Sequence, residues 1–95
     1  MQEELAERVV LVLDELASNG LRHGSPPVTV QLGNHPDGWL VIVSDAAVDH
    51  LPTPAFDRPA GQGGYGLHVI AELAAAHGIY RDGVAKSVWA LLPRA

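Results

Sequence analysis

The segment ELASNGLRHG, residues 15–24, places polar side chains on one side of a stretch that otherwise has the pattern of an apolar helix. Glu15 and Asn19 are four residues apart, so in a helix they project from the same side, and Arg22 follows three residues later. A carboxylate and an amide oxygen are hard ligands that suit Mg²⁺, and a guanidinium suits phosphate. The segment therefore indicates either a metal and phosphate site or a solvated polar face opposite the apolar stripe.

Asp45 is the second candidate, because it follows the wholly apolar run WLVIV at residues 39–43. A carboxylate at the end of such a strand must find hydrogen-bond donors or water. It can cap the turn that follows the strand. As a functional residue it would accept a hydrogen bond from the amino group of a ligand at the edge of the sheet.

The third candidate is the glycine-rich segment GQGGYGLHVIAEL, residues 61–73. Gly61, Gly63 and Gly66 satisfy the pattern G-x-G-x-x-G, but a proline-containing loop precedes them where a dinucleotide-binding turn would need a strand. Glycines let the backbone approach a ligand closely, and the first amides of a helix attract an anion. The segment is either a phosphate-binding loop or a flexible hinge before a helix.

Hydrophobic periodicity predicts two helices and two hairpins that position these groups. The alternating run at 28–32 predicts a half-buried strand, and WLVIV predicts a central strand of the same sheet. The expected order is helix Glu3 to about Leu21, strands Val28–Leu32 and Trp39–Val43, loop Ala46–Gly64, helix Tyr65–His77 closed by Gly78, and strands Ile79–Arg81 and Lys86–Leu92. We therefore expect an α+β fold, in which two helices cover one face of a mixed, largely antiparallel sheet.

Length and composition limit the possible functions. A chain of 95 residues with 47% hydrophobic and 18% charged residues is expected to form one globular domain, residues 1–95. A formal net charge of −5, with no basic run, argues against nucleic acid and anionic membranes as partners. The absence of cysteine excludes disulfides, and no apolar stretch approaches the roughly 20 residues of a membrane span. The sequence thus predicts a cytoplasmic protein.

Taken together and in order, the three segments resemble the histidine-kinase-like (GHKL, Bergerat-fold) ATPases. ELASNGLRHG resembles the N box, VIVSDAAVDHLP resembles the region of the first glycine box, and GQGGYGLHVIAELAAAHG resembles the lid and second glycine box. The ending AKSVWALLP is similar to the final strand of the actinobacterial anti-sigma-factor serine kinases, the subgroup that the chain resembles most. The resemblance spans nearly the whole chain.

This resemblance implies ATP and Mg²⁺ as cofactors and assigns roles by position. Glu15 would act as the general base, Asn19 would contribute to Mg²⁺ binding, Asp45 would receive the adenine amino group, and Arg22 would meet the phosphates. Ser87 lies where a threonine of the nucleotide site is frequent. The lid residues implied in cofactor binding are Gly61, Gly63, Gly64, Tyr65, Gly66 and Leu67.

The chain also departs from the family pattern. The run DAAVDHLP, which begins at Asp45, lacks the glycines that usually follow the aspartate, and Ala85 replaces a glycine before Lys86. Family members usually carry a further helix and strand before the N box, so the expected two-layer sandwich lacks both and has an open sheet edge. Such an edge can recruit a partner or a second copy of the chain.

The preferred functional hypothesis is a Mg²⁺-ATP-dependent serine/threonine protein kinase of a partner-switching system. By resemblance, its partners would be an anti-sigma-factor antagonist or a sigma factor, with a homodimer as a further possibility. The first alternative is the catalytic domain of a two-component histidine kinase. The second is a catalytically silent module that keeps the fold and binds a regulator without nucleotide.

Overall fold

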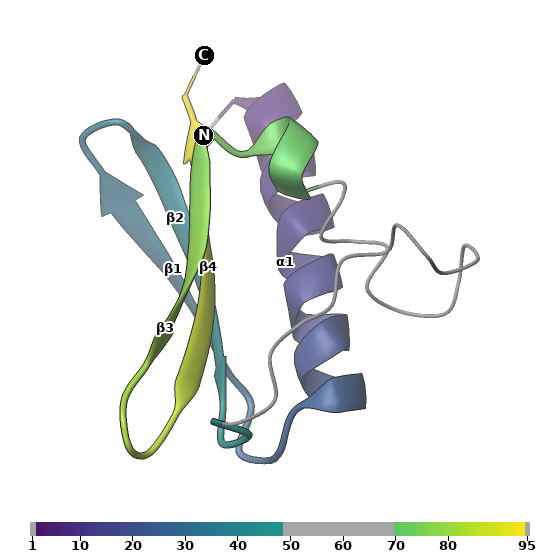
Figure 1. Cartoon of the computed structure of the whole chain (residues 1–95). Helices are drawn as coiled ribbons and strands as arrows, with labels where there is room; N and C mark the ends of the chain where they lie inside the picture. Colours follow the sequence, from purple (N-terminus) through teal and green to yellow (C-terminus); the bar gives the residue numbers. More distant parts are fainter. Residues whose placement is uncertain (1, 49–69, 95) are drawn as a thin grey trace.

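The computed structural model describes residues 2–48 and 70–94, and it shows one long helix packed on a four-stranded sheet (Figure 1). A short helical turn at residues 70–73 precedes the third strand and lies on the same side of the sheet as the long helix. The elements are α1 (Glu3–His23), β1 (Thr29–His35), β2 (Gly38–Asp45), β3 (Ala76–Arg81) and β4 (Lys86–Pro93). The predicted α+β class, with helices on one face of the sheet, is confirmed.

Helix α1 forms because its apolar residues recur at three- and four-residue steps and can all face the sheet. The buried residues of this stripe are Leu5, Val9, Val12, Leu16 and Gly20. Glu3 and Glu4 occupy the first turn, where they interact favourably with the helix dipole. The helix ends at Gly24, whose N–H donates to the carbonyl of Gly20 at 2.9 Å. The predicted helix is confirmed and extends to His23, two residues beyond the expected end.

The four strands form two hairpins, joined through the pairing of β2 with β4 in the middle of the sheet. The strand order is β1-β2-β4-β3, and every pairing among the described strands is antiparallel. Because side chains alternate along a strand, one set on β2 and β4 faces α1 and the other set faces away. The α1 side has Val41 opposite Ala90, and the far side has Ile42 opposite Trp89.

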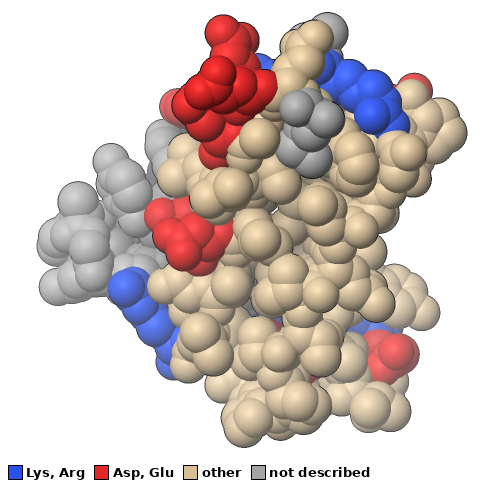
Figure 2. Space-filling view, turned by 180° about the vertical axis from the view of Figure 1, so that it is seen from behind, with Lys and Arg blue, Asp and Glu red and all other residues tan. Residues whose placement is uncertain are grey.

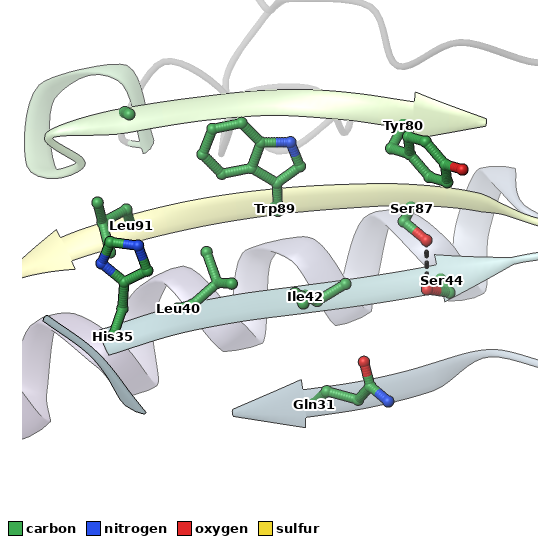
Figure 3. A pocket seen from close by; sticks show the side chains of 10 residues that line it. Gln31, His35, Leu40, Ile42, Ser44, Tyr80, Ser87, Trp89 and Leu91 are labelled. Carbon is green, nitrogen blue, oxygen red and sulfur yellow. Dashed lines mark hydrogen bonds between the residues drawn. The ribbon is translucent and has the colours of Figure 1, made fainter. Parts of the chain in front are cut away.

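The core lies between α1 and the two central strands, and Ile70 of the short helical turn closes it. Besides the α1 stripe, its buried members are Val41, Val43, Ile70, Ala90 and Leu92. On the opposite face of the sheet, apolar side chains of β2 and β4 line a hollow of about 530 Å³ (Figure 3). Each central strand is therefore apolar on both faces, as the run WLVIV predicted for β2.

The second predicted helix is wrong at its C-terminal end. Helical structure in the described residues ends at Leu73, and β3 begins at Ala76, so the expected helical extension to His77 is a strand. Gly78 lies inside β3 and does not close a helix. A Cβ atom on it would lie only 2.9 Å from the Trp89 ring, so the indole packs against the bare backbone at this point. The start of this helix, residues 65–69, falls outside the described residues.

Strand β1 is more exposed than its alternating pattern predicted. Val30 and Leu32 are 46% and 48% exposed, although both lie on the α1 side of the sheet, opposite Val43 and Val41. Helix α1 packs mainly on β2 and β4 and does not cover these two side chains. The expectation of a half-buried strand is therefore wrong, because the alternation identified the face but not whether another element covers it.

Charged side chains lie at the border of the face shown in Figure 2, and uncharged residues fill its centre.

The carboxylate of Asp82, in the β3–β4 turn, accepts hydrogen bonds from the N–H groups of Val84 and Ala85 at 2.7 and 2.8 Å. Hydrogen bonding from Ala85 and then from Val84 lowers the pKa of this carboxyl. No helix in the described part of the chain is long and apolar enough to span a bilayer.

The packing of Gly38 gives a test of the sheet. A Cβ atom on Gly38 would overlap the carbonyl oxygen of Leu92 in β4, so we expect Gly38→Ala to lower the free energy of unfolding by about 2 kcal/mol. Gly33→Ala is the matched control, because its Cβ would lie 4.0 Å from the nearest atom, in Leu40. Urea unfolding should show a change within about 0.5 kcal/mol for the control. Equal stability of the two variants would contradict the register of β2 and β4.

Candidate functional site

Asp45 is the last residue of β2, and its side chain is 4% exposed. Its Oδ1 accepts the backbone N–H of Ala47 at 2.7 Å and, more weakly, that of Ser25 at 3.4 Å. These bonds cap the turn after β2 and tie it to the segment that follows α1. A buried carboxylate requires such donors, because burial without them would be costly. The capping role that the sequence allowed for this residue is present.

The other carboxylate oxygen of Asp45 faces Lys86, the only lysine in the chain. Lys86 begins β4 and lies directly opposite Asp45 in the register of β2 and β4. Its Nζ is 3.4 Å from Oδ2, and its side chain is as buried as that of Asp45. The two residues therefore form a buried ion pair on the α1 side of the sheet. Neither charge has water as its main partner, so each depends on the other.

The end of α1 is shaped so that the Asp45 carboxyl can lie against it. A Cβ atom on Gly24 would be 2.5 Å from Cγ of Asp45 and 2.6 Å from the carbonyl oxygen of Gly20, so only glycine fits at position 24. One turn earlier, a Cβ on Gly20 would lie 3.2 Å from Val28. These two glycines let the last turn of α1 approach the end of β2 closely. The strand-end acid and the helix that carries the first polar segment are thus in contact.

The polar residues of α1 lie on the flank of the helix beside its buried stripe. Glu15 and Asn19 are both partly buried, and each directly precedes a residue of the stripe. Arg22 is exposed in the last turn of the helix. The expected alignment of the three side chains along one side of α1 is therefore what helical geometry produces. Asn19 directly precedes Gly20. The carbonyl of Gly20 accepts the N–H of Gly24, the residue at the helix end that packs against Asp45.

Ser87 is not brought to Asp45. It is the neighbour of Lys86 in β4, so its side chain points to the other face of the sheet. There its Oγ is 2.7 Å from Oγ of Ser44, in the hollow that also holds Trp89 (Figure 3). Helix α1 lies behind the sheet in this view. A ligand bound between α1 and Asp45 would not reach the Ser87 hydroxyl.

Residues 61–69 of the glycine-rich segment lie outside the described residues. The predicted lid residues all lie outside the described residues, and their roles stay predictions; they are Gly61, Gly63, Gly64, Tyr65, Gly66 and Leu67. The segment rejoins the described chain at Ile70, which is buried in the core beside α1.

Two residues of this region did not emerge as site residues from the sequence. The sequence marks Lys86 only as a family feature, because its pairing with Asp45 depends on the register between strands about 40 residues apart. Arg8 lies two turns before Glu15 on the same flank of α1. Its Nε is buried without a hydrogen-bond partner in the described part of the chain. Arg8 precedes Glu15 by seven residues, or about two helical turns. This spacing predicts that the two side chains lie on the same side of the helix.

The donor set fits a hard cation that brings other ligands with it. No group of three or more His, Cys, Asp or Glu side chains suited to a metal occurs among the described residues. Glu15 and Asn19 offer one carboxylate and one amide oxygen a single turn apart. Mg²⁺ commonly takes one or two protein oxygens and completes its shell with water and phosphate. These two residues therefore fit Mg²⁺ bound together with a phosphate ligand, and not a closed protein cage.

Comparison with known proteins assigns the chain to one family. The family model described as histidine kinase-like ATPase domain matches residues 1–91, which is nearly the whole chain. No curated protein matches the chain.

The Asp45–Lys86 pair can be tested by a double-mutant cycle. Asp45→Asn or Lys86→Met leaves one buried charge without its partner, so we expect each to lower the free energy of unfolding by about 3 kcal/mol. The double variant should be clearly more stable than the sum of the two losses predicts. Denaturant unfolding monitored by circular dichroism gives the three values. If the losses simply add, the two side chains do not interact.

Proposed function

We propose that this chain, which belongs to the histidine kinase-like ATPase domain family, is a Mg²⁺-ATP-dependent serine/threonine protein kinase of the anti-sigma-factor type. The family match supports ATP binding and a regulatory role. The proposed kinase activity is argued from the polar residues of α1, which are Glu15, Asn19 and Arg22. The observation that carries the proposal is the contact between the buried Asp45 carboxyl and the last turn of α1, the helix that bears Glu15 and Asn19.

In this proposal, Asp45 recognises adenine by accepting a hydrogen bond from its amino group. Oδ1 is committed to the backbone N–H groups of Ala47 and Ser25. Oδ2 faces Lys86 at 3.4 Å, which is longer than the 2.7–2.9 Å typical of a strong charge-assisted hydrogen bond. Oδ2 therefore retains capacity to accept from a ligand. The N–H groups of Ala47 and Ser25 orient the carboxylate. Lys86 balances its charge, and the charge of Lys86 is not available to the phosphates while it is paired.

The flank of α1 supplies the groups for phosphoryl transfer. Asn19 would hold Mg²⁺ through its amide oxygen, and Arg22, exposed at the end of the helix, would meet phosphate charge. Bound Mg²⁺ would neutralise the charge that develops on the transferred phosphoryl group. Glu15 would take the proton from the attacking serine hydroxyl as general base. Positioning and charge neutralisation provide most of the catalysis in such transfers. Glu15, Asn19 and Arg22 are side chains of the types that these two effects require.

The proposed substrate is a serine or threonine of a small antagonist protein, and the proposed regulatory partner is a sigma factor. Both follow from the resemblance of the N box, the strand-end acid and the final strand to the anti-sigma-factor kinases. The two-component histidine kinase remains an alternative that shares the nucleotide site. The two differ in the amino acid that receives phosphate, so acid-stable label on serine supports the proposal and acid-labile label on histidine supports the alternative.

A second candidate function has its own support in the structure. Within the described part of the chain, the Asp45 carboxylate interacts with the N–H groups of Ser25 and Ala47 and with the buried ammonium group of Lys86. A domain that has replaced the ligand's amino group with Lys86 would keep the fold but bind no nucleotide. This describes a silent interaction module. Direct measurement of ATP binding separates the two functions.

We expect Mg²⁺-ATP to bind the wild-type chain, and Asp45→Asn to weaken binding at least about 10-fold, the effect of losing a hydrogen bond to a charged acceptor. Lys86→Met is the matched control, because it breaks the same ion pair but keeps the acceptor, and it should bind within about 3-fold of wild type. Isothermal titration calorimetry below the melting temperature of each variant gives the affinities. No heat and no thermal shift with millimolar Mg²⁺-ATP would establish the silent module.

Glu15→Ala is expected to leave Mg²⁺-ATP affinity nearly unchanged but to reduce phosphoryl transfer at least about 100-fold, because a general base acts on the transfer step. Asp14→Ala is the control, since Asp14 is an exposed acid on the outer side of the same helix. Single-turnover transfer of labelled phosphate from ATP measures the rate. Equal rates for the two variants would remove the assigned role from Glu15.

A further inference from the structure

The face of the sheet opposite α1 carries its polar and apolar side chains in separate rows that run across the strands. Residues paired in antiparallel strands point to the same face, so each row follows from the register. One row, the hydroxyl row, takes one hydroxyl group from each strand, those of Thr29, Ser44, Ser87 and Tyr80. The next two rows of the described strands contain no hydroxyl group. This face therefore has one polar end and an apolar centre.

Small residues on the two outer strands make the centre of this face concave. In the two rows beside the hydroxyl row, β1 contributes Gly33, and β3 contributes Gly78 and Ala76. The central strands contribute large apolar side chains, which form the floor of the hollow of about 530 Å³ (Figure 3); they are Leu40, Ile42, Trp89 and Leu91. This volume falls within the roughly 300–1,000 Å³ that is typical of sites for small molecules.

The indole of Trp89 gives this floor a flat aromatic surface. Gly78 lies opposite Trp89 in the register of β3 and β4, and a Cβ atom on it would be 2.9 Å from the ring. The indole is therefore held against the bare backbone of β3. Figure 3 shows the ring nearly face-on between β4 and β3, so its outer face is turned toward the hollow. An aromatic ring of a ligand can stack on that face.

A pair of hydroxyl groups marks the polar end of the hollow. The Oγ atoms of Ser44 and Ser87 are 2.7 Å apart, and either one can be the donor. This bond uses one of the two hydroxyl protons, so the pair can still donate to a ligand oxygen and can also accept from it. Tyr80 lies at the same end of the hollow, and His35 lies at the opposite end (Figure 3).

The hollow is suited to an uncharged ligand. Among the described residues that line it there is no Lys, Arg, Asp or Glu. The buried charges of Asp45 and Lys86, the sequence neighbours of this serine pair, lie on the α1 side of the sheet. A phosphate or carboxylate in the hollow would lose hydration without gaining a cation, so ionic ligands, ATP included, are disfavoured. The four strands together span only about 14 Å, which is the scale of a small molecule.

We propose that this hollow binds a small, uncharged aromatic molecule that carries a hydroxyl or carbonyl oxygen at one end. Its rings lie flat on the apolar floor and stack on Trp89, and its oxygen meets the Ser44–Ser87 pair. The distance from the hydroxyl row to Leu91 is four residues along β4, or roughly 13 Å. A molecule of about two to four fused rings occupies this length. The site does not depend on the proposed kinase activity, because it lies on the other face of the sheet from Asp45 and α1.

Naphthol, which is naphthalene with one hydroxyl group, is a probe of this class and is uncharged at neutral pH. We expect it to bind the wild-type chain with a dissociation constant of roughly 50–500 μM, as suits a fragment of its size, and to shift the NMR signal of the Trp89 indole N–H. Naphthalene should bind at least about 3-fold more weakly, although it is more hydrophobic, because it cannot hydrogen-bond to the serine pair. Naphthalene sulfonate should not shift the Trp89 signal, because its charge has no partner in the hollow.

Three results of this titration would overturn the proposal. One is a Trp89 signal that stays unchanged up to about 2 mM naphthol, a concentration well above the expected dissociation constant. The second is naphthalene binding as tightly as naphthol. The third is naphthalene sulfonate binding at Trp89 with the affinity of naphthol.

The double variant Ser44→Ala/Ser87→Ala tests the polar end of the site. It should bind naphthol about as weakly as the wild-type chain binds naphthalene, and its affinity for naphthalene should be unchanged. Removing both partners of a hydrogen bond together leaves no unpaired group, so the variant is expected to fold. Unchanged naphthol affinity in this variant would contradict the assigned role of the serine pair.

Ala76→Phe tests the position of the site, because the added ring projects into the hollow from β3. We expect it to weaken naphthol binding at least about 10-fold by steric exclusion. His77→Phe is the matched control, since it places the same side chain on the α1 face of the same strand, and it should bind within about 2-fold of wild type. Equal naphthol affinities of the two variants would overturn the proposal. If Ala76→Phe does not fold, the titrations of the wild-type chain and of the serine variant still decide it.

Discussion

The close approach of α1 to the end of β2 is the constraint on which the rest of the structure depends. Gly24 and Gly20 remove the side chains that would hold the helix away, and the Asp45 carboxyl fills the space against the helix end. Lys86 then balances the buried charge from the neighbouring strand. One cluster thereby fixes the helix, the turn after β2 and the start of β4 relative to one another. The same cluster sets the distance between the strand-end acid and the polar flank of the helix.

Local patterns predicted the elements of this fold, but tertiary packing decided their surroundings. The periods of α1, β2 and β4 were clear enough to assign each element and the side chains that face the core. The pairing of Asp45 with Lys86 could not be predicted, because it requires the register between β2 and β4. Ser87 shows the same limitation, since a shift of one residue along β4 moves a side chain to the other face of the sheet.

The errors at β1 and β3 have a shared cause. Alternating apolar residues give the orientation of a strand but do not reveal whether a helix covers it, and α1 leaves Val30 and Leu32 in contact with solvent. The run AAAHG before Ile79 has no period that separates the end of a helix from the start of a strand. Pairing with β4 makes this run the start of a strand. The N–H of Ala75 donates to the Leu91 carbonyl, and Ala76 is the first residue of β3. Helical propensity is a weak influence beside such pairing.

Residue-resolved NMR during titration with Mg²⁺-ATP shows whether the strand-end acid and the helix flank belong to one nucleotide site. We expect the signals of the Asn19 side-chain amide and of the Ala47 backbone amide, which donates to Asp45, to shift together with one dissociation constant. The chemical shift of the indole N–H of Trp89, on the opposite face of the sheet, should not change. Shifts at Trp89 without shifts at Asn19 and Ala47 would contradict the account.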